Sequence, residues 1–463
     1  MKESNFFSEQ KMIIFLLLLT LIGGGLYIFI TPPWQAPDEN VHYEYIHILS
    51  RAKLFNIKQK PDYGLQKKII QSMDQFYAWK YVHRKAPSPL PEKFRQCPVY
   101  GESLSKVNRP PIYYFLGSFV LKIFRNNNLL VNHYLIRLFS LFISLITIYF
   151  TYRSAKLVFE NDSYSILAST FFVAFLPQFI SQSCSINSDI LANLIGAIAI
   201  FFFLFSIKKY QNHYILLLFP IIIVFGLLTK RTTFFIIPAF IIYMIIFLYK
   251  NIKSNKQKSL ISSIVYILVM VSAFLLFINI FPSLFERVDK YLFHWGGGLS
   301  ELNKLLGLSF YSNFNLNFIE TLFKSFWFCP GWMAFPLPNS IYQILKLISF
   351  MGIIGLIMFF GRKISNIQKN FPIKFEYLIL LISICLISLM SIFIRFDFTD
   401  LPMARSIFPA LTAFSILFVM GIREFIPERV KKTGLIIFIF LLIALNIYGI
   451  FDHLVNSFYF SYF

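Results

Sequence analysis

Apolar runs of about twenty residues recur along almost the whole of this chain. Each run is long enough to cross the roughly 30 Å hydrocarbon core of a bilayer as a helix. Hydrophobic residues make up 57% of the 463 residues and charged residues only 14%. A soluble domain of this length could not bury so much apolar surface in one core. The pattern therefore predicts an all-α fold, a polytopic bundle of membrane-spanning helices.

About eleven spans can be placed on these runs. The first is followed by Pro32 and Pro33 rather than by a small-residue cleavage site, so we interpret it as an uncleaved span. The predicted spans cover residues 12–31, 134–153, 163–181, 188–207, 213–229, 232–250, 259–281, 340–361, 375–395, 405–423 and 433–455.

The basic residues that give the chain its net charge of +21 concentrate in alternate short loops, such as 250–258 and 423–432. Cytoplasmic loops carry this excess of lysine and arginine. We therefore expect a multi-pass protein of an inner or plasma membrane, with a cytoplasmic N-terminus. No basic block is interleaved with base-stacking aromatics, so no nucleic-acid partner is expected.

Two long segments, 32–133 and 282–339, then lie on the outer side. The first contains Arg109, Pro110 and Pro111, followed by an apolar run to Phe124 that is too short to span comfortably. We expect this run to form a helix at the outer interface. The chain is predicted to be one domain, 1–463, with two outer loops and no separate soluble domain.

The first outer loop opens with adjacent acids, Asp38 and Glu39, after Pro37. A carboxylate held in a partly dry, proline-fixed loop can act as a general base, and His42 follows one turn later. The alternative is that Asp38 caps the helix expected from Glu39 to Leu49. Asp38 is our first candidate for the base, and Glu39 stays open as the second.

A third acid, Asp189, stands at a short outer turn, where it could also cap the following span. Fixed cations at an outer surface suit a phosphate-bearing lipid, although each alone could simply extend toward lipid headgroups. Although most basic residues of the short loops are predicted to be cytoplasmic, we single out five that are predicted to lie on the outer side: Arg109, Arg137, Lys230, Arg231 and Arg405.

The second outer loop is rich in aromatics, including Trp327 and Trp332. These residues could belong to an interfacial aromatic belt. They could also form a wall for a prenyl chain or a sugar.

A divalent cation stays open as a cofactor. Asp38, Glu39, His42 and His47 could supply ligands, although their spacing is not a standard zinc pattern. The cysteines have no metal-type spacing. Three of them are expected on the outer side, which would allow one disulfide: Cys97, Cys184 and Cys329.

No Asp, Glu, Lys or Arg lies near the middle of a predicted span. Ion-coupled transporters and channels usually need such groups there. Ionisable residues gather at the outer surface instead, which favours an enzyme that works at the membrane interface.

Six short motifs in order resemble the GT-C superfamily of membrane glycosyltransferases, closest to a bacterial branch of predicted membrane proteins of largely unassigned function. They are 32–42 (PPWQAPDENVH), 109–114 (RPPIYY), 187–189 (NSD), 228–230 (LTK), 326–332 (FWFCPGW) and 405–409 (RSIFP). One position departs from the branch, which often has Gly-Arg-Tyr where this chain has Ala404-Arg405-Ser406.

The resemblance implies a hexosyl or pentosyl transferase that moves a sugar from a polyprenyl-phosphate donor to a glycan or lipid-linked acceptor outside the cytoplasm. One base acting by in-line displacement predicts inversion at the anomeric carbon. Membrane lipids are the other expected partners. The alternatives are a transporter or flippase of lipid-linked saccharides, a polysaccharide polymerase or ligase, and an inactive scaffold in an envelope assembly.

Overall fold

The structure is a computed structural model that describes residues 3–52, 59–81, 87–97, 107, 111–124, 126–208, 213–253, 316–364, 373–395 and 403–460. These residues form helices and connecting turns, with no strand among them. The prediction of an all-α helical bundle is confirmed.

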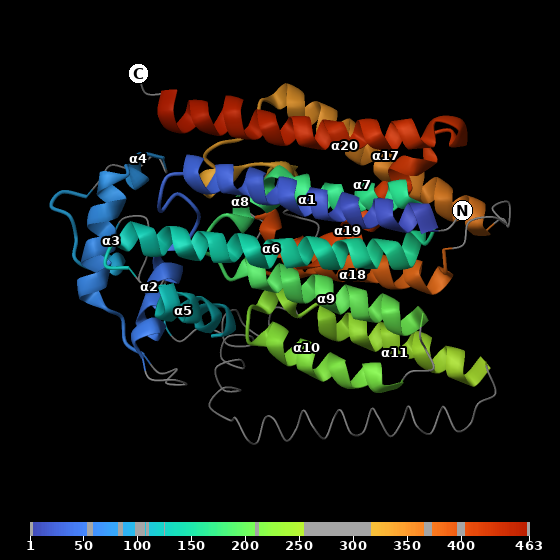
Figure 1. Cartoon of the computed structure of the whole chain (residues 1–463), viewed down its shortest axis with the longest axis horizontal. Coiled ribbons are helices and arrows are strands. Elements are labelled where there is room, and N and C mark those ends of the chain that lie inside the picture. The colour runs from blue at the N-terminus through green and yellow to red at the C-terminus, as the bar shows by residue number, and fades with distance from the viewer. Residues whose placement is uncertain are drawn as a thin grey trace.

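The long helices run side by side along the longest axis of the molecule (Figure 1). Their apolar residues surround each helix rather than forming one stripe, as expected for helices that face lipid on one side and protein on the other. They are α1 (Glu3–Ile30), α6 (Leu129–Phe159), α7 (Ser163–Phe175), α9 (Asp189–Lys208), α10 (Leu218–Leu227), α11 (Ile236–Lys253), α17 (Asn339–Ile364), α18 (Phe375–Arg395), α19 (Leu411–Glu424) and α20 (Lys431–Tyr448), which continues into the π-helix η7 (Gly449–Phe460).

Shorter elements connect and cap these helices. The α-helices among them are α2 (Glu39–Arg51), α3 (Tyr63–Gln75), α4 (Ala78–Tyr81), α5 (Ile112–Phe124), α8 (Pro177–Ser183), α15 (Leu316–Trp327) and α16 (Pro330–Met333). The 3-10 helices are η1 (Phe94–Gln96), η2 (His213–Leu217), η3 (Arg231–Thr233), η5 (Ala404–Ala410) and η6 (Glu428–Val430).

Eight helices in the described part of the chain are long and apolar enough to cross a membrane. A ninth span results if α7 and α8, which meet at a bend of 56°, are counted together. The predicted span 213–229 corresponds to a shorter apolar helix, Ile215–Leu227. The predicted span 259–281 lies outside the described residues. The number eleven therefore stays a prediction.

The described parts of the predicted first outer loop lie at the end of the bundle where α1 ends and α6 begins (Figure 1). There α3 crosses the bundle end, and α5 packs on α2, with Gly117 against the side chain of Ile46. The helix expected to follow Pro110 and Pro111 is thus present as α5, although Arg109 and Pro110 lie outside the described residues. Its depth in the membrane stays a prediction.

The segments predicted to be cytoplasmic meet one another. Lys208 pairs with Glu160 at 3.6 Å, and Lys431 pairs with Asp162 at 2.7 Å. These contacts agree with the loop alternation derived from the basic residues. Which end of the bundle faces the cytoplasm stays a prediction.

One close contact between α9 and η5 positions η5 in the bundle. At Gly196 of α9, a Cβ atom would overlap the carbonyl oxygen of Pro409 in η5. The two backbones touch because glycine has no side chain to separate them. Small residues allow this kind of approach between membrane helices.

Candidate functional site

A buried ion pair between Glu39 and Arg137 holds the loop that follows α1. The guanidinium donates from Nε and Nη2 to the two carboxylate oxygens, both at 2.8 Å. Its remaining N–H groups donate to the carbonyl oxygens of Ile28, Thr31 and Pro32. All five donors of Arg137 are therefore used, and the loop from residue 31 to 39 is fixed to α6.

The other contacts of Glu39 complete this enclosure. The backbone N–H groups of Trp34 and Ile186 donate to its carboxylate, each at 3.1 Å. Burial alone would raise the pKa of Glu39, but the charges of Arg137 and His133 outweigh it, so the pKa of Glu39 lies well below its ordinary value. Glu39 is thus a buried anion surrounded by donors.

Asp38 sits next to this pair in a left-handed backbone conformation, with φ at 63°. Trp34 has a similar φ of 69°, and its indole Nε1 donates to Ser72 Oγ at 2.9 Å. Such backbone conformations are unfavourable for non-glycine residues unless the surroundings hold them. Asp38 occupies the N-cap position of α2, but its side chain makes no capping hydrogen bond. The capping alternative is therefore wrong for its carboxylate.

The two catalytic candidates Asp38 and Asp189 meet at one cation, Arg405. Its Nη2 lies 4.0 Å from Asp38 Oδ2, and its Nε lies 3.8 Å from Asp189 Oδ2. Lys230 Nζ lies 2.5 Å from Asp189 Oδ1. We call Asp38, Asp189, Lys230 and Arg405 the ionic cluster. Its two carboxylates and two cations balance in charge.

Three separate segments bring the cluster together. Asp189 begins α9, where the side chain of Asn187 accepts from its backbone N–H at 2.9 Å. Lys230 precedes η3, and Arg405 lies in η5, which touches α9 at Gly196. Asn187 thus provides a cap at this turn, while the carboxylate of Asp189 faces Lys230 and Arg405.

The remaining predicted site residues differ in their placement. His42 is buried, and its Nδ1 lies 2.9 Å from the hydroxyl of Tyr114, against which it stacks. Arg231 is partly exposed and makes no ion pair with a residue that the structure describes. Arg109 and the side chain of Trp332 lie outside the described residues. Trp327 is buried among Phe172 and Phe418, apart from the ionic cluster.

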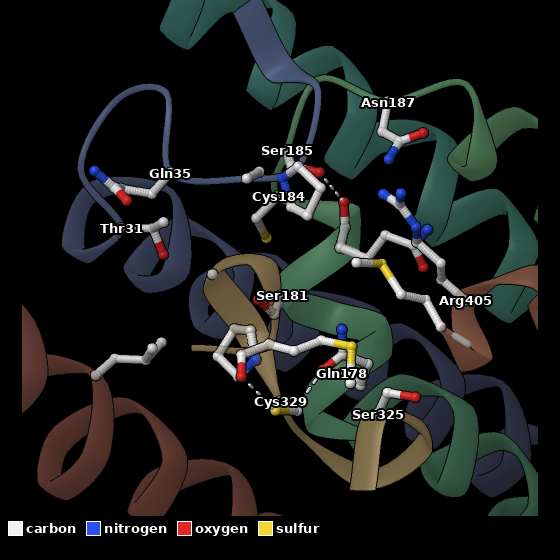
Figure 2. Close-up of a pocket in the computed structure, with 18 of the residues that line it drawn as sticks. Thr31, Gln35, Gln178, Ser181, Cys184, Ser185, Asn187, Ser325, Cys329 and Arg405 are labelled. Carbon is white, nitrogen blue, oxygen red and sulfur yellow. Dashed lines mark hydrogen bonds between the residues drawn. The ribbon is translucent and has the colours of Figure 1, made fainter. Parts of the chain in front are cut away.

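A polar cavity opens beside the cluster (Figure 2). Pro37 of the loop and Arg405 of η5 both line it, so the cavity reaches the residues that flank Asp38. Arg137 lines it too, and the amide and hydroxyl side chains of the lining are those of Thr31, Gln35, Gln178, Ser181, Gln182, Ser185, Asn187 and Ser325. Groups of this kind hydrogen-bond to the hydroxyls of a sugar.

An apolar groove of about 600 Å³ lies between α15, α17, α18 and α19. Trp327 and Phe326 line it, as does Ile407 of η5, two residues after Arg405. The groove and the ionic cluster therefore share η5 as a common wall.

In the described part of the chain, no group of three or more His, Cys, Asp or Glu side chains is arranged to hold a metal ion. All four cysteines are free and buried, so the disulfide considered for Cys97, Cys184 and Cys329 does not form. Two of these residues, Cys184 and Cys329, line the polar cavity (Figure 2).

Residues 108–277 match the model of the dolichyl-phosphate-mannose-protein mannosyltransferase family, a membrane glycosyltransferase domain of the GT-C type. The resemblance to GT-C glycosyltransferases is confirmed. The matched segment contains Asp189, Lys230 and Arg231, whereas Asp38 and Arg405 lie outside it. No curated protein matches the chain.

Two features of this candidate site were not predicted from the sequence. Arg137 was considered only as a cation on the outer side, not as the partner of Glu39. Its position inside an apolar helix was the available signal, because a buried arginine in a span is usually paired. Gln182 carries no motif, and only the bend between α7 and α8 turns it into the cavity lining.

Proposed function

We propose that this chain transfers a sugar from a polyprenyl-phosphate donor to a glycan or lipid-linked acceptor on the extracytoplasmic side of the membrane. The family match supports the coarser statement, a membrane glycosyltransferase of the GT-C type. The observation that carries the finer proposal is Arg405, which lies between Asp38 and Asp189 beside a polar cavity. We propose further that residues 1–463 act as a single domain.

Asp38 is the proposed base. An acceptor hydroxyl attacks the anomeric carbon, Asp38 takes the hydroxyl proton, and the bond from the anomeric carbon to the phosphate oxygen breaks. Glu39 is the poorer candidate, because Arg137 and two backbone N–H groups already occupy its carboxylate. We assign Glu39 a positioning role.

Arg405 and Lys230 are the proposed binders of the donor phosphate. The leaving polyprenyl phosphate gains no proton in this scheme, so fixed cations must stabilise its charge. At 4.0 Å the contact of Arg405 with Asp38 is loose. When the phosphate binds Arg405, the hold on Asp38 weakens and its carboxylate becomes a stronger base. Asp189, almost fully buried, keeps both cations in place.

The apolar groove is the proposed seat of the polyprenyl chain. Its lining includes the exposed side chain of Ile353 on α17 and Ile407 of η5, two residues after Arg405, the proposed phosphate binder. With Asp38 as the one base and the phosphate as the leaving group, in-line displacement predicts inversion at the anomeric carbon.

The test is sugar transfer by purified protein in liposomes that contain polyprenyl-phosphate sugars. Asp38→Asn removes the base but suits the backbone, because asparagine tolerates a positive φ. We expect a rate loss of about 10²-fold to 10⁴-fold with unchanged thermal unfolding. Glu92→Gln changes an exposed acid of the same outer loop and serves as the control.

Full activity of Asp38→Asn would remove Asp38 from the mechanism. A wild-type protein that moves labelled donor across the liposome membrane without consuming it would instead indicate a flippase. If Asp38→Asn still transfers sugar and Glu39→Gln does not, Glu39 is the base and Asp38 has the positioning role.

A further inference from the structure

Gln182 has a buried side-chain amide that lines the polar cavity. Its side chain is 7% exposed, and neither Nε2 nor Oε1 has a hydrogen-bond partner among the described residues. Gln35 lies in the same cavity lining, is 2% exposed, and its Nε2 also has no partner there. Buried polar groups in native proteins are almost always paired. Unpaired amides that line a cavity therefore indicate a ligand that pairs them.

Gln178 shows the contrast within the same cavity. Its Oε1 accepts from the backbone N–H of Cys329 at 2.7 Å, which ties α8 to the turn before α16 (Figure 2). The amide of Gln178 thus stabilises the fold. The amide of Gln182, one helical turn further along α8, has no such use.

The charges around the cavity are already compensated. The two arginines of the lining are Arg137, paired with Glu39, and Arg405, paired with Asp38 and Asp189. A charged sugar would find no free counter-charge among the described lining residues, and burying it there would be unfavourable. A sugar hydroxyl both donates and accepts, which matches the two ends of a glutamine amide.

We propose that Gln182, assisted by Gln35, binds hydroxyl groups of an uncharged donor sugar and selects it against uronic acids and amino sugars. This inference rests on the proposed function, since the sugar is the one attached to the phosphate at Arg405. Amide recognition adds a specificity residue from α8, a helix that carries none of the ionic cluster.

The test compares Gln182→Met with Gln178→Met, two substitutions of the same chemistry in the same short helix. Donors are polyprenyl-phosphate glucose, mannose and galactose, with the glucuronate and glucosamine derivatives as charged competitors. For the preferred neutral donor, Gln182→Met is expected to lower kcat/KM about 10-fold through KM. Its melting temperature should stay the same or rise, because an unpaired buried amide is replaced by an apolar group. Gln178→Met should lower the melting temperature.

Unchanged kinetics in Gln182→Met would overturn the proposal and mean that only water pairs the amide. A fall in melting temperature equal to that of Gln178→Met would also overturn it, because the amide would then be structural. Preference of the wild type for glucuronate would do the same.

Failure of the proposed function gives a different result. If the wild type transfers no sugar, methyl glucoside and glucuronate are added to the detergent-purified protein during thermal unfolding. A rise in melting temperature with methyl glucoside alone, absent in Gln182→Met, would support the sugar subsite without the transfer reaction. No rise with either compound would overturn both.

Discussion

Glu39 and Arg137 form a fully buried ion pair in which every N–H group of the guanidinium has an acceptor. The pair ties the end of α1 to α6 and to the start of α2. Because Asp38 precedes Glu39, its backbone position is fixed by the same contacts. The conformation of the loop at Asp38 therefore depends on this ion pair.

Removal of Arg137 tests this dependence. Arg137→Met leaves the Glu39 carboxylate buried without its counter-charge, so we expect a loss of about 3–5 kcal/mol in the free energy of unfolding. Adding Glu39→Leu should recover part of that stability without restoring sugar transfer. Thermal unfolding in detergent measures the first effect. Lys67→Met breaks an exposed pair with Glu92 and should change little. An Arg137→Met variant as stable as the wild type would contradict a stabilising role for the ion pair of Arg137 and Glu39.

Lys230 and Arg231 are adjacent cations with different contacts. Lys230 pairs with Asp189, whereas Arg231 makes no ion pair with a described residue. We expect Lys230→Gln to lower kcat/KM about 10²-fold, because it removes phosphate stabilisation and leaves Asp189 with fewer partners. Arg231→Gln should change it by less than about 3-fold, consistent with a mainly surface role. Initial rates at several donor concentrations distinguish the two. Equal losses of kcat/KM in the two variants would indicate that Arg231 also contacts the donor phosphate.

Glu44 should give the outer loop a pH-dependent stability. This carboxyl of α2 is buried, and burial raises its pKa to about 7 from 4.5, while hydrogen bonds from Gln66 and from the backbone of Asp62 lower it in part. The folded state then holds a proton that the unfolded state has lost. Stability from this group is complete below pH 4.5 and is lost as the pH rises to about 7. The total loss is about 3 kcal/mol.

Melting temperatures at pH 5 and pH 8 measure this effect. Glu44→Gln keeps the acceptor for Gln66 and Asp62, so it should raise the melting temperature at pH 8 and reduce the difference between the two pH values. Glu92→Gln, at an exposed site, should leave the difference as it is in the wild type. A wild-type protein with no loss of stability between these pH values would contradict the prediction.

The apolar groove predicts a dependence on donor chain length. Ser349→Phe fills the groove between α15 and α17, and should lower the rate with a long polyprenyl donor about 10-fold. A donor with a short, soluble prenyl chain should be transferred at nearly the wild-type rate. Leu347→Phe is the control, since that side chain is exposed and does not line the groove. Equal losses with both donors would place the chain elsewhere.

The apolar runs were sufficient to predict the helical bundle, because length and hydropathy alone determine whether a helix can span a bilayer. The grouping of Asp38, Asp189, Lys230 and Arg405 also followed from the sequence, since loop charges assigned all four to one side. The pairing of Glu39 with Arg137 did not follow from the sequence. Arg137 reaches Glu39 across 98 residues of chain, and no local pattern encodes that contact. For the same reason the sequence did not single out Gln182, whose proposed role depends on the unpaired atoms of its buried amide rather than on a motif.

The backbone contact between Gly196 and Pro409 has a consequence for how such a protein can diversify. It sets how closely α9 approaches η5, the two elements that carry Asp189 and Arg405, through a contact between their backbones. Residues of α8, which carries none of the ionic cluster, can therefore be exchanged while Asp189 and Arg405 keep their spacing. A lineage could change the sugar it accepts by substitutions such as those at position 182 and retain the same chemical step throughout.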